Sequence, residues 1–160
     1  MKFQKSGIVS LLICLLLFAG CSKDDEPLKE IEVAFGPYMF VFPAGFKHIP
    51  EQGIDSSPGT VTNGKMVFNY DYGSYNSPPN DFPGEEEVIE ENIEGHYLRM
   101  ARPLDPQNGR TNIYLYRLDD VTGEEGELVS TLLMTSTNLT PEEQELAISI
   151  FSSLTIIPPN

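Results

Sequence analysis

The side chains best suited to ligand chemistry follow a tyrosine-rich segment in the middle of the chain. Residues 68–72 alternate aromatic and polar side chains, and a Pro-rich stretch that contains Tyr75 comes after them. Aromatic rings beside carboxylate and hydroxyl groups can hold a sugar ring or an extended peptide. With a nearby polar turn, these residues form a candidate ligand site that consists of Asp55, Ser56, Asp71, Tyr72 and Tyr75. The alternative is that the tyrosines only pack at the margin of a sheet, with their hydroxyls in water.

Two histidines, His48 and His96, are the candidate acid–base groups. A hydrolytic reaction would need one of them beside a hydroxyl nucleophile or a water, with a carboxylate that orients the ring. The residues available for these roles are Ser56, Ser57, Asp55 and Asp71. The sequence contains no nucleophile elbow, Gly-rich phosphate loop or metal-binding helix motif. We therefore expect a protein without catalytic residues; the alternative is a hydrolase of an extracellular polysaccharide or peptide polymer.

An acidic run near position 120 is the candidate cation site. Its carboxylates are Asp119, Asp120, Glu124, Glu125 and Glu127. Carboxylate oxygens bind calcium, but this spacing does not match an EF-hand loop, and a solvated hairpin tip explains the run better. Zinc is disfavoured because the two histidines are not at ligand spacing. We expect no bound metal and no cofactor.

The charge of the chain excludes one class of partner. It contains 10 Lys and Arg against 24 Asp and Glu, a formal net charge of −14. Removal of the first 20 residues, with Lys2 and Lys5, leaves a net charge near −16. Because such an acidic surface repels polyphosphate, we expect no nucleic-acid partner. A partner attracted by this charge would be cationic, such as a basic protein patch or a divalent ion. The alternative, which explains the charge better, is that it keeps the protein soluble at a crowded cell surface and needs no specific ligand.

The N-terminus has the pattern of an export signal. Lys2 and Lys5 precede an apolar run over residues 8–18, which is too short to span a bilayer and is typical of a cleaved signal peptide. Ala19-Gly20-Cys21 then resembles the bacterial lipobox. The resemblance implies that residues 1–20 are removed and that Cys21 is acylated.

The residues after Cys21 indicate where the lipid anchor would lie. Ser22-Lys23-Asp24-Asp25-Glu26 resembles the surface-export signal of lipoproteins in the Bacteroidota. That resemblance implies the outer membrane, with the protein facing the extracellular side. The partners we expect are the membrane, through the lipid anchor, and a glycan or protein at the cell surface. We expect residues 21–33 to form an acidic, flexible tether. The oligomeric state stays open.

The hydrophobic pattern predicts several strands. Residues 38–42 are apolar on both faces, as in an interior strand, and Asn63-Gly64 predicts a two-residue type I′ turn in a hairpin over residues 60–72. Residues 85–91 fit either a helical turn or an edge strand. Further strands are expected over residues 96–102, 112–118, 128–136 and 155–157.

A helix is expected near the C-terminus. Thr140, Pro141 and Glu143 have the pattern of a capping box with proline at the first helical position. An apolar stripe follows at helical spacing: Leu146, Ala147, Ile150, Phe151 and Leu154.

Several short motifs carry a resemblance over most of residues 40–157. They are Phe-Pro-Ala-Gly-Phe at 42–46, Gly-Ile-Asp-Ser at 53–56, Asn-Tyr-Asp-Tyr-Gly at 69–73, Ile-Glu-Gly at 93–95 and the closing helix. Together they resemble small surface lipoproteins of the Bacteroidota, and their order is similar to the PsbP-like α+β fold. We expect one α+β domain over residues 34–157, with a single antiparallel β-sheet, a C-terminal helix packed on one face, and a tail at residues 158–160. The role we expect is a lipid-anchored binding or accessory module.

Overall fold

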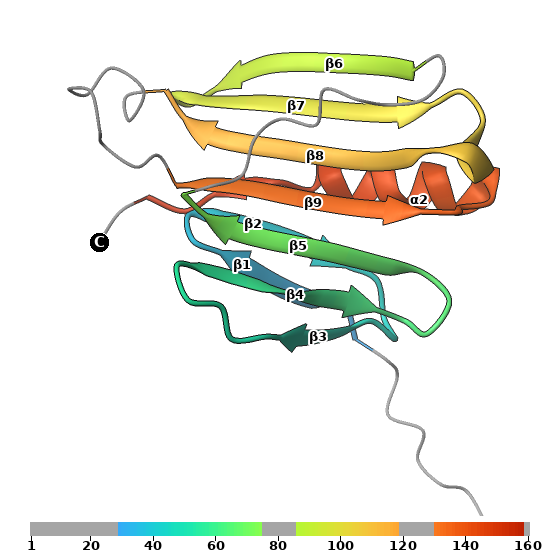
Figure 1. Cartoon of the computed structure of the whole chain (residues 1–160), viewed down its shortest axis with the longest axis horizontal. Coiled ribbons are helices and arrows are strands. Elements are labelled where there is room, and N and C mark those ends of the chain that lie inside the picture. Colours follow the sequence, from blue (N-terminus) through green and yellow to red (C-terminus); the bar gives the residue numbers. More distant parts are fainter. Residues whose placement is uncertain (1–28, 75–85, 119–129, 159–160) are drawn as a thin grey trace, which may run out of the picture.

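Two antiparallel sheets make up most of the structure, a computed structural model that describes residues 29–74, 86–118 and 130–158 (Figure 1). Strands account for 56% of these residues. The large sheet has seven strands in the order β3-β4-β5-β9-β8-β7-β6, and the small sheet has three in the order β1-β2-β10. The strands are β1 (Ile31–Phe35), β2 (Tyr38–Phe42), β3 (Lys47–Pro50), β4 (Ser56–Thr62), β5 (Val67–Gly73), β6 (Glu86–Ile93), β7 (His96–Pro103), β8 (Arg110–Arg117), β9 (Thr131–Thr137) and β10 (Thr155–Ile156). The described helices are the 3₁₀ helix η2 (Pro106–Asn108) and α2 (Pro141–Ser152).

The expectation of an α+β fold with a single sheet is wrong, because the structure is mostly β and has a second sheet. β2 is an interior strand, as expected, but it pairs with β1 and β10 and not with the large sheet. Gly36, with φ +58°, turns β1 back onto β2, and the chain after α2 returns along the other edge of β2. Residues 31–33, which we expected to belong to the flexible tether, lie in β1.

The small sheet and α2 cover the same face of the large sheet. Figure 1 shows the small sheet behind β4 and β5, and α2 behind β8 and β9. We call this covered side the core face and the opposite side the outer face. On the core face, the ring of Phe68 lies 5.6 Å from that of Phe42 in the small sheet and 5.8 Å from that of Phe151 in α2. One hydrophobic core thus joins both sheets and the helix.

The central hairpin is present, but its turn differs from the expected one. Met66, Phe68 and Tyr70 are buried, as the alternation predicts. Thr62 pairs with Val67, so four residues form the turn, and among the described residues with positive φ only Gly64 belongs to it. A type I′ turn requires positive φ at both central positions. In the wider turn, the side-chain Oδ1 of Asn63 accepts a hydrogen bond of 2.8 Å from the backbone N–H of Met66, which stabilises it.

The C-terminal helix begins as predicted. Thr140 Oγ1 accepts from the backbone N–H of Glu143, and the Glu143 carboxylate accepts from the backbone N–H of Thr140. The apolar stripe faces the core, where Ala147, Ile150 and Phe151 are buried. None of the helices in the described ranges has the length and apolarity that a transmembrane helix needs.

Candidate functional site

The residues predicted to form a ligand site do not share one face of the sheet. Asp71 lies on the outer face of β5, while Tyr72 lies on the core face, where its ring packs edge-on to that of Tyr38, 6.5 Å away. Ser56 pairs with Gly73 across the strands and so shares the outer face with Asp71, two positions along. Asp55 is exposed beside them, and Tyr75 lies outside the described residues. Strand geometry therefore keeps Tyr72 away from the outer-face pair, because successive side chains point to opposite faces.

Both histidines are hydrogen-bonded to tyrosine hydroxyls. His48 Nε2 lies 2.7 Å from the hydroxyl of Tyr70, and His96 Nδ1 lies 3.0 Å from the hydroxyl of Tyr38. The second contact joins β7 of the large sheet to β2 of the small sheet. Desolvation lowers the pKa of His48. Burial raises the pKa of Tyr70, and the charge of Glu51 raises it further.

The serines that a catalytic histidine would need lie elsewhere. His48 pairs with Val61 across the strands and contacts Tyr70 on the core face, whereas Ser56 lies on the outer face. Ser57 is on the core side but four positions along β4 from Val61, which corresponds to about 13 Å along a strand. The structure therefore does not bring His48 together with Ser56 or Ser57.

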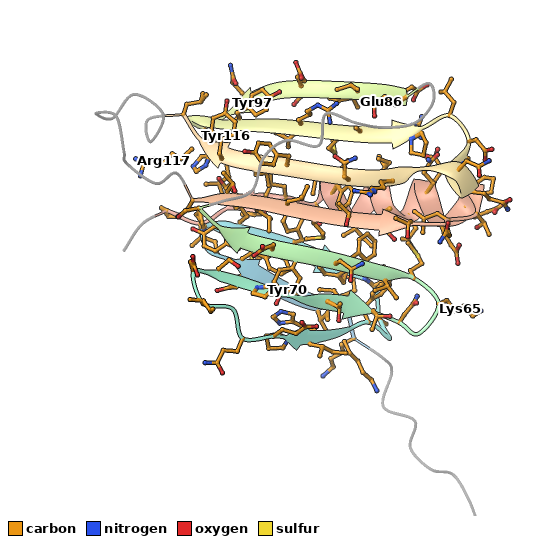
Figure 2. The ribbon with its side chains drawn as sticks, viewed as in Figure 1. Lys65, Tyr70, Glu86, Tyr97, Tyr116 and Arg117 are labelled. Atoms are coloured by element: carbon orange, nitrogen blue, oxygen red, sulfur yellow. The ribbon has the colours of Figure 1, made fainter. Side chains whose placement is uncertain are left out.

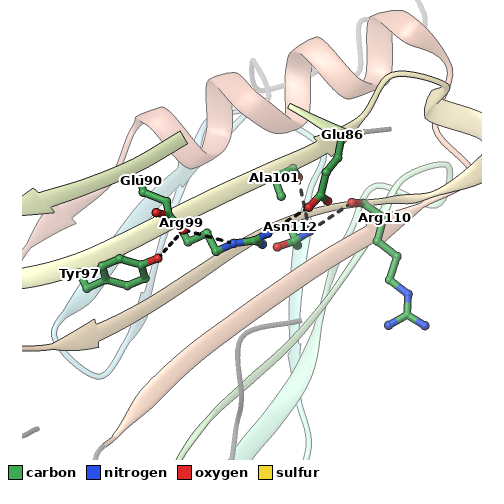
Figure 3. Close-up of polar contacts among 7 residues, drawn as sticks. All are labelled: Glu86, Glu90, Tyr97, Arg99, Ala101, Arg110 and Asn112. Carbon is green, nitrogen blue, oxygen red and sulfur yellow. Dashed lines mark hydrogen bonds and ion pairs between the residues drawn. The ribbon is translucent and has the colours of Figure 1, made fainter. Parts of the chain in front are cut away.

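The most connected polar cluster lies on the outer face of β6 and β7, and it was not predicted from the sequence (Figure 3). Arg99 Nη2 lies 3.1 Å from the carboxylate of Glu86, and Arg99 Nε lies 3.7 Å from that of Glu90. The hydroxyl of Tyr97 donates a hydrogen bond of 2.8 Å to Glu90. Burial, reinforced by this hydrogen bond and by the negative charge of Glu90, raises the pKa of Tyr97 to about 12. The ring of Tyr97 also lies 4.9 Å from that of Tyr116 on β8 (Figure 2).

A buried amide lies beside this cluster. Figure 3 shows the Arg99 side chain running along the sheet toward Glu86, next to Asn112. Asn112 is fully buried, and its Nδ2 donates to the backbone carbonyls of Ala101 and Arg110 at 3.4 and 3.2 Å. These two acceptors determine which way the amide points. Its Oδ1 has no hydrogen-bond partner within the described part of the chain.

A second ion-pair cluster and a groove occupy the core side of the same strands. Arg102 lies 2.7 Å from the carboxylate of Glu87 on β6 and 2.6 Å from that of Glu145 on α2. These three residues surround a groove of about 170 Å³. Its apolar walls are Ile89, Met100 and Ile148. β7 thus carries one arginine on each face, and β6 supplies at least one carboxylate to each of them.

Among the described strands, β6 forms one edge of the large sheet. It is eight residues long, it contains no proline, and beyond it the order of the described strands ends. Ile89 and Val88 in its middle are 46% and 41% exposed. The opposite edge, β3, has only four residues and ends at Pro50, which lacks a backbone N–H. Two sequence signals could have indicated this site. One is the set of four glutamates within residues 86–91, and the other is the separation of Arg99 and Arg102 by three positions, which places them on opposite faces of a strand.

Some predicted site residues cannot be placed. Cys21, the export-signal residues 22–26 and the acidic run at 119–127 all lie outside the described residues. Within the part of the chain that the structure describes, no three His, Cys, Asp or Glu side chains are grouped so that they could hold a metal ion.

Comparison with known protein families and curated proteins identifies no relative of this chain. The sequence matches no protein-family model, and no curated protein is significantly similar to it. A function for this chain is therefore proposed on its own residues and their placement.

Proposed function

We propose that this protein is a lipid-anchored, non-catalytic binding module at the outer cell surface. The observation that carries the binding role is the open, eight-residue edge strand β6 with an apolar groove beside it. A long exposed edge strand presents unpaired backbone donors and acceptors, which is a template for a partner. A non-catalytic role is supported by the placement of His48, whose imidazole is engaged by Tyr70 and lies away from Ser56.

The carboxylates of β6 are not placed only to prevent pairing with other strands at this edge. Charged residues commonly protect edge strands from unwanted pairing. Here Glu86 and Glu90 contact Arg99, and Glu87 contacts Arg102, so three of the carboxylates are drawn back toward β7. This arrangement supports an edge that remains accessible to a selected partner.

The lipid anchor is proposed from the N-terminal residues. The apolar run and Cys21 are typical of a lipoprotein signal, and residues 22–26 are similar to a surface-export signal. Since β1 begins at Ile31, the tether from Cys21 has ten residues and a maximal reach of about 35 Å. The domain would therefore lie close to the membrane surface.

Replacing Cys21 with Ala is expected to abolish lipidation and to release the protein from membranes. Acyl chains contribute about 0.8 kcal/mol for each buried methylene, so their loss removes nearly all membrane affinity. The measurement is fatty-acid labelling together with membrane fractionation of cells that express each variant. Protease added to whole cells should digest the wild-type protein if it faces outward. Equal labelling of both variants would contradict the assignment of Cys21.

The binding role is tested with two matched edge variants. Ile89 and Ile49 are exposed to the same degree, 46% and 48%, on the opposite edge strands β6 and β3. We expect Ile89→Lys to abolish binding to peptide or glycan arrays, and Ile49→Lys to leave it unchanged. An esterase, glycosidase and peptidase screen runs beside the arrays. Turnover by the wild type that is lost in His48→Ala would contradict the proposal and favour a hydrolase.

A further inference from the structure

We propose that β6 binds an extended basic segment of a partner protein, which adds to the large sheet as an eighth strand. The inference rests on the proposed binding role and specifies its partner. In strand addition, backbone hydrogen bonds supply affinity, and the alternating side chains of the added strand supply specificity.

The backbone of β6 has the geometry for strand addition. All eight of its residues pair with β7 in a continuous antiparallel register, from Glu86 opposite Pro103 to Ile93 opposite His96. In such a ladder, alternate residues direct their N–H and C=O groups away from the partner strand. No other described strand lies on that side to accept them. A regular row of peptide donors and acceptors matches another peptide backbone better than it matches a sugar ring.

The two faces of β6 call for different side chains. On the outer face, Glu86 and Glu90 lie on either side of Val88. On the core side, Ile89 borders the groove formed with Met100 and Ile148. A strand that alternates basic and apolar residues would place its cations beside the outer carboxylates and its apolar side chains against the groove.

Charge favours a cationic occupant over a second copy of this chain. Five carboxylates surround the edge and the groove, against the guanidiniums of Arg99 and Arg102, which leaves an excess of three negative charges. The carboxylates are Glu86, Glu87, Glu90, Glu91 and Glu145. A second copy would bring another strand with four glutamates, and like charges on neighbouring strands are destabilising. A basic segment would neutralise them.

The test uses the full chain and a blocked synthetic peptide, Lys-Val-Lys-Ile-Lys-Val-Lys, with a fluorescent label. We expect saturable binding by fluorescence anisotropy, which weakens as salt screens the exposed charges. Hydrogen exchange should slow in residues 86–93 when the peptide binds, and not in β3. Ile89→Lys should weaken binding at least about tenfold, whereas Ile49→Lys should change it by less than about twofold.

Three further arms make the outcome decisive. Replacement of every Lys in the peptide by Glu should abolish binding, and a scrambled peptide of the same composition should bind weakly. Light scattering should show no β6-dependent dimer. Strand addition is overturned if the peptide does not bind, if it protects β3 as strongly as β6, or if it binds Ile89→Lys as well as the wild type. It is also overturned if the wild type forms a dimer that Ile89→Lys abolishes. If array ligands still depend on Ile89 while the basic peptide does not bind, strand addition fails and the proposed binding role stands.

Discussion

Replacing Phe68 with Ala is expected to lower the free energy of unfolding by about 3–5 kcal/mol, the usual range for a buried phenylalanine. Its side chain is fully buried and packs against Phe42, Phe46 and Phe151. It therefore contacts β2 of the small sheet, the loop after it and α2, while its own backbone lies in the large sheet. With a total stability of about 5–15 kcal/mol, this loss is a large share of what holds the fold.

Urea unfolding followed by circular dichroism and tyrosine fluorescence measures the effect. The matched control is Val67→Ala, the preceding residue on the other face of β5, which is 42% exposed and should change stability by less than about 0.5 kcal/mol. The wild type should unfold in one transition, since one core joins both sheets. Separate transitions for the two probes, or a loss below about 1 kcal/mol in Phe68→Ala, would contradict this account.

Replacing Gly36 with Ala is expected to destabilise the protein by about 2–5 kcal/mol, because two penalties combine. Gly36 has φ +58°, a conformation that residues with a Cβ adopt at a cost. The added Cβ would also overlap the ring of Tyr72, which lies directly over this turn. The turn and the ring belong to different sheets, so relieving the clash would require the Tyr72 ring to move away from the turn.

Gly45→Ala separates the two penalties. Gly45 also has positive φ, at +95°, but an added Cβ there meets no atom within 4 Å. It should therefore show only the backbone cost. In a double-mutant cycle, Tyr72→Ala should recover part of the loss caused by Gly36→Ala, as expected for residues in contact. Equal losses at both glycines would show that the Tyr72 contact is unimportant.

Local features of the fold could be predicted from the sequence. The helix start depends on Thr140 and Glu143, three positions apart, and it forms as expected. The alternation over residues 66–70 likewise places Met66, Phe68 and Tyr70 in the core correctly. Both signals depend on neighbours within a few positions, where backbone geometry alone decides which side chains meet.

The number of sheets could not be predicted, because it depends on which distant strands pair. An apolar strand such as β2 fits the interior of either sheet, and no local pattern states that its partners are β1 and β10. The same limit applies to the candidate site. Tyr72 and Asp71 are adjacent in sequence but separated by the sheet, whereas Arg99 meets Glu86 only because β6 and β7 pair in one particular register. Ion pairs across strands follow register, and register is a property of the folded sheet.

The pairing of β10 with β2 has a consequence for how the chain is made and moved. Thr155 and Ile156 lie opposite Met39 and Tyr38, and the backbone N–H of Val41 donates to Ser153 Oγ, 112 positions along the chain. Because a polypeptide is synthesised from its N-terminus, the small sheet cannot be completed until β10 has left the ribosome. Contacts of such long range are also slow to form, because closing a long loop costs entropy. On the proposed export route, the small sheet would therefore be completed only after β10 has passed through the translocation channel.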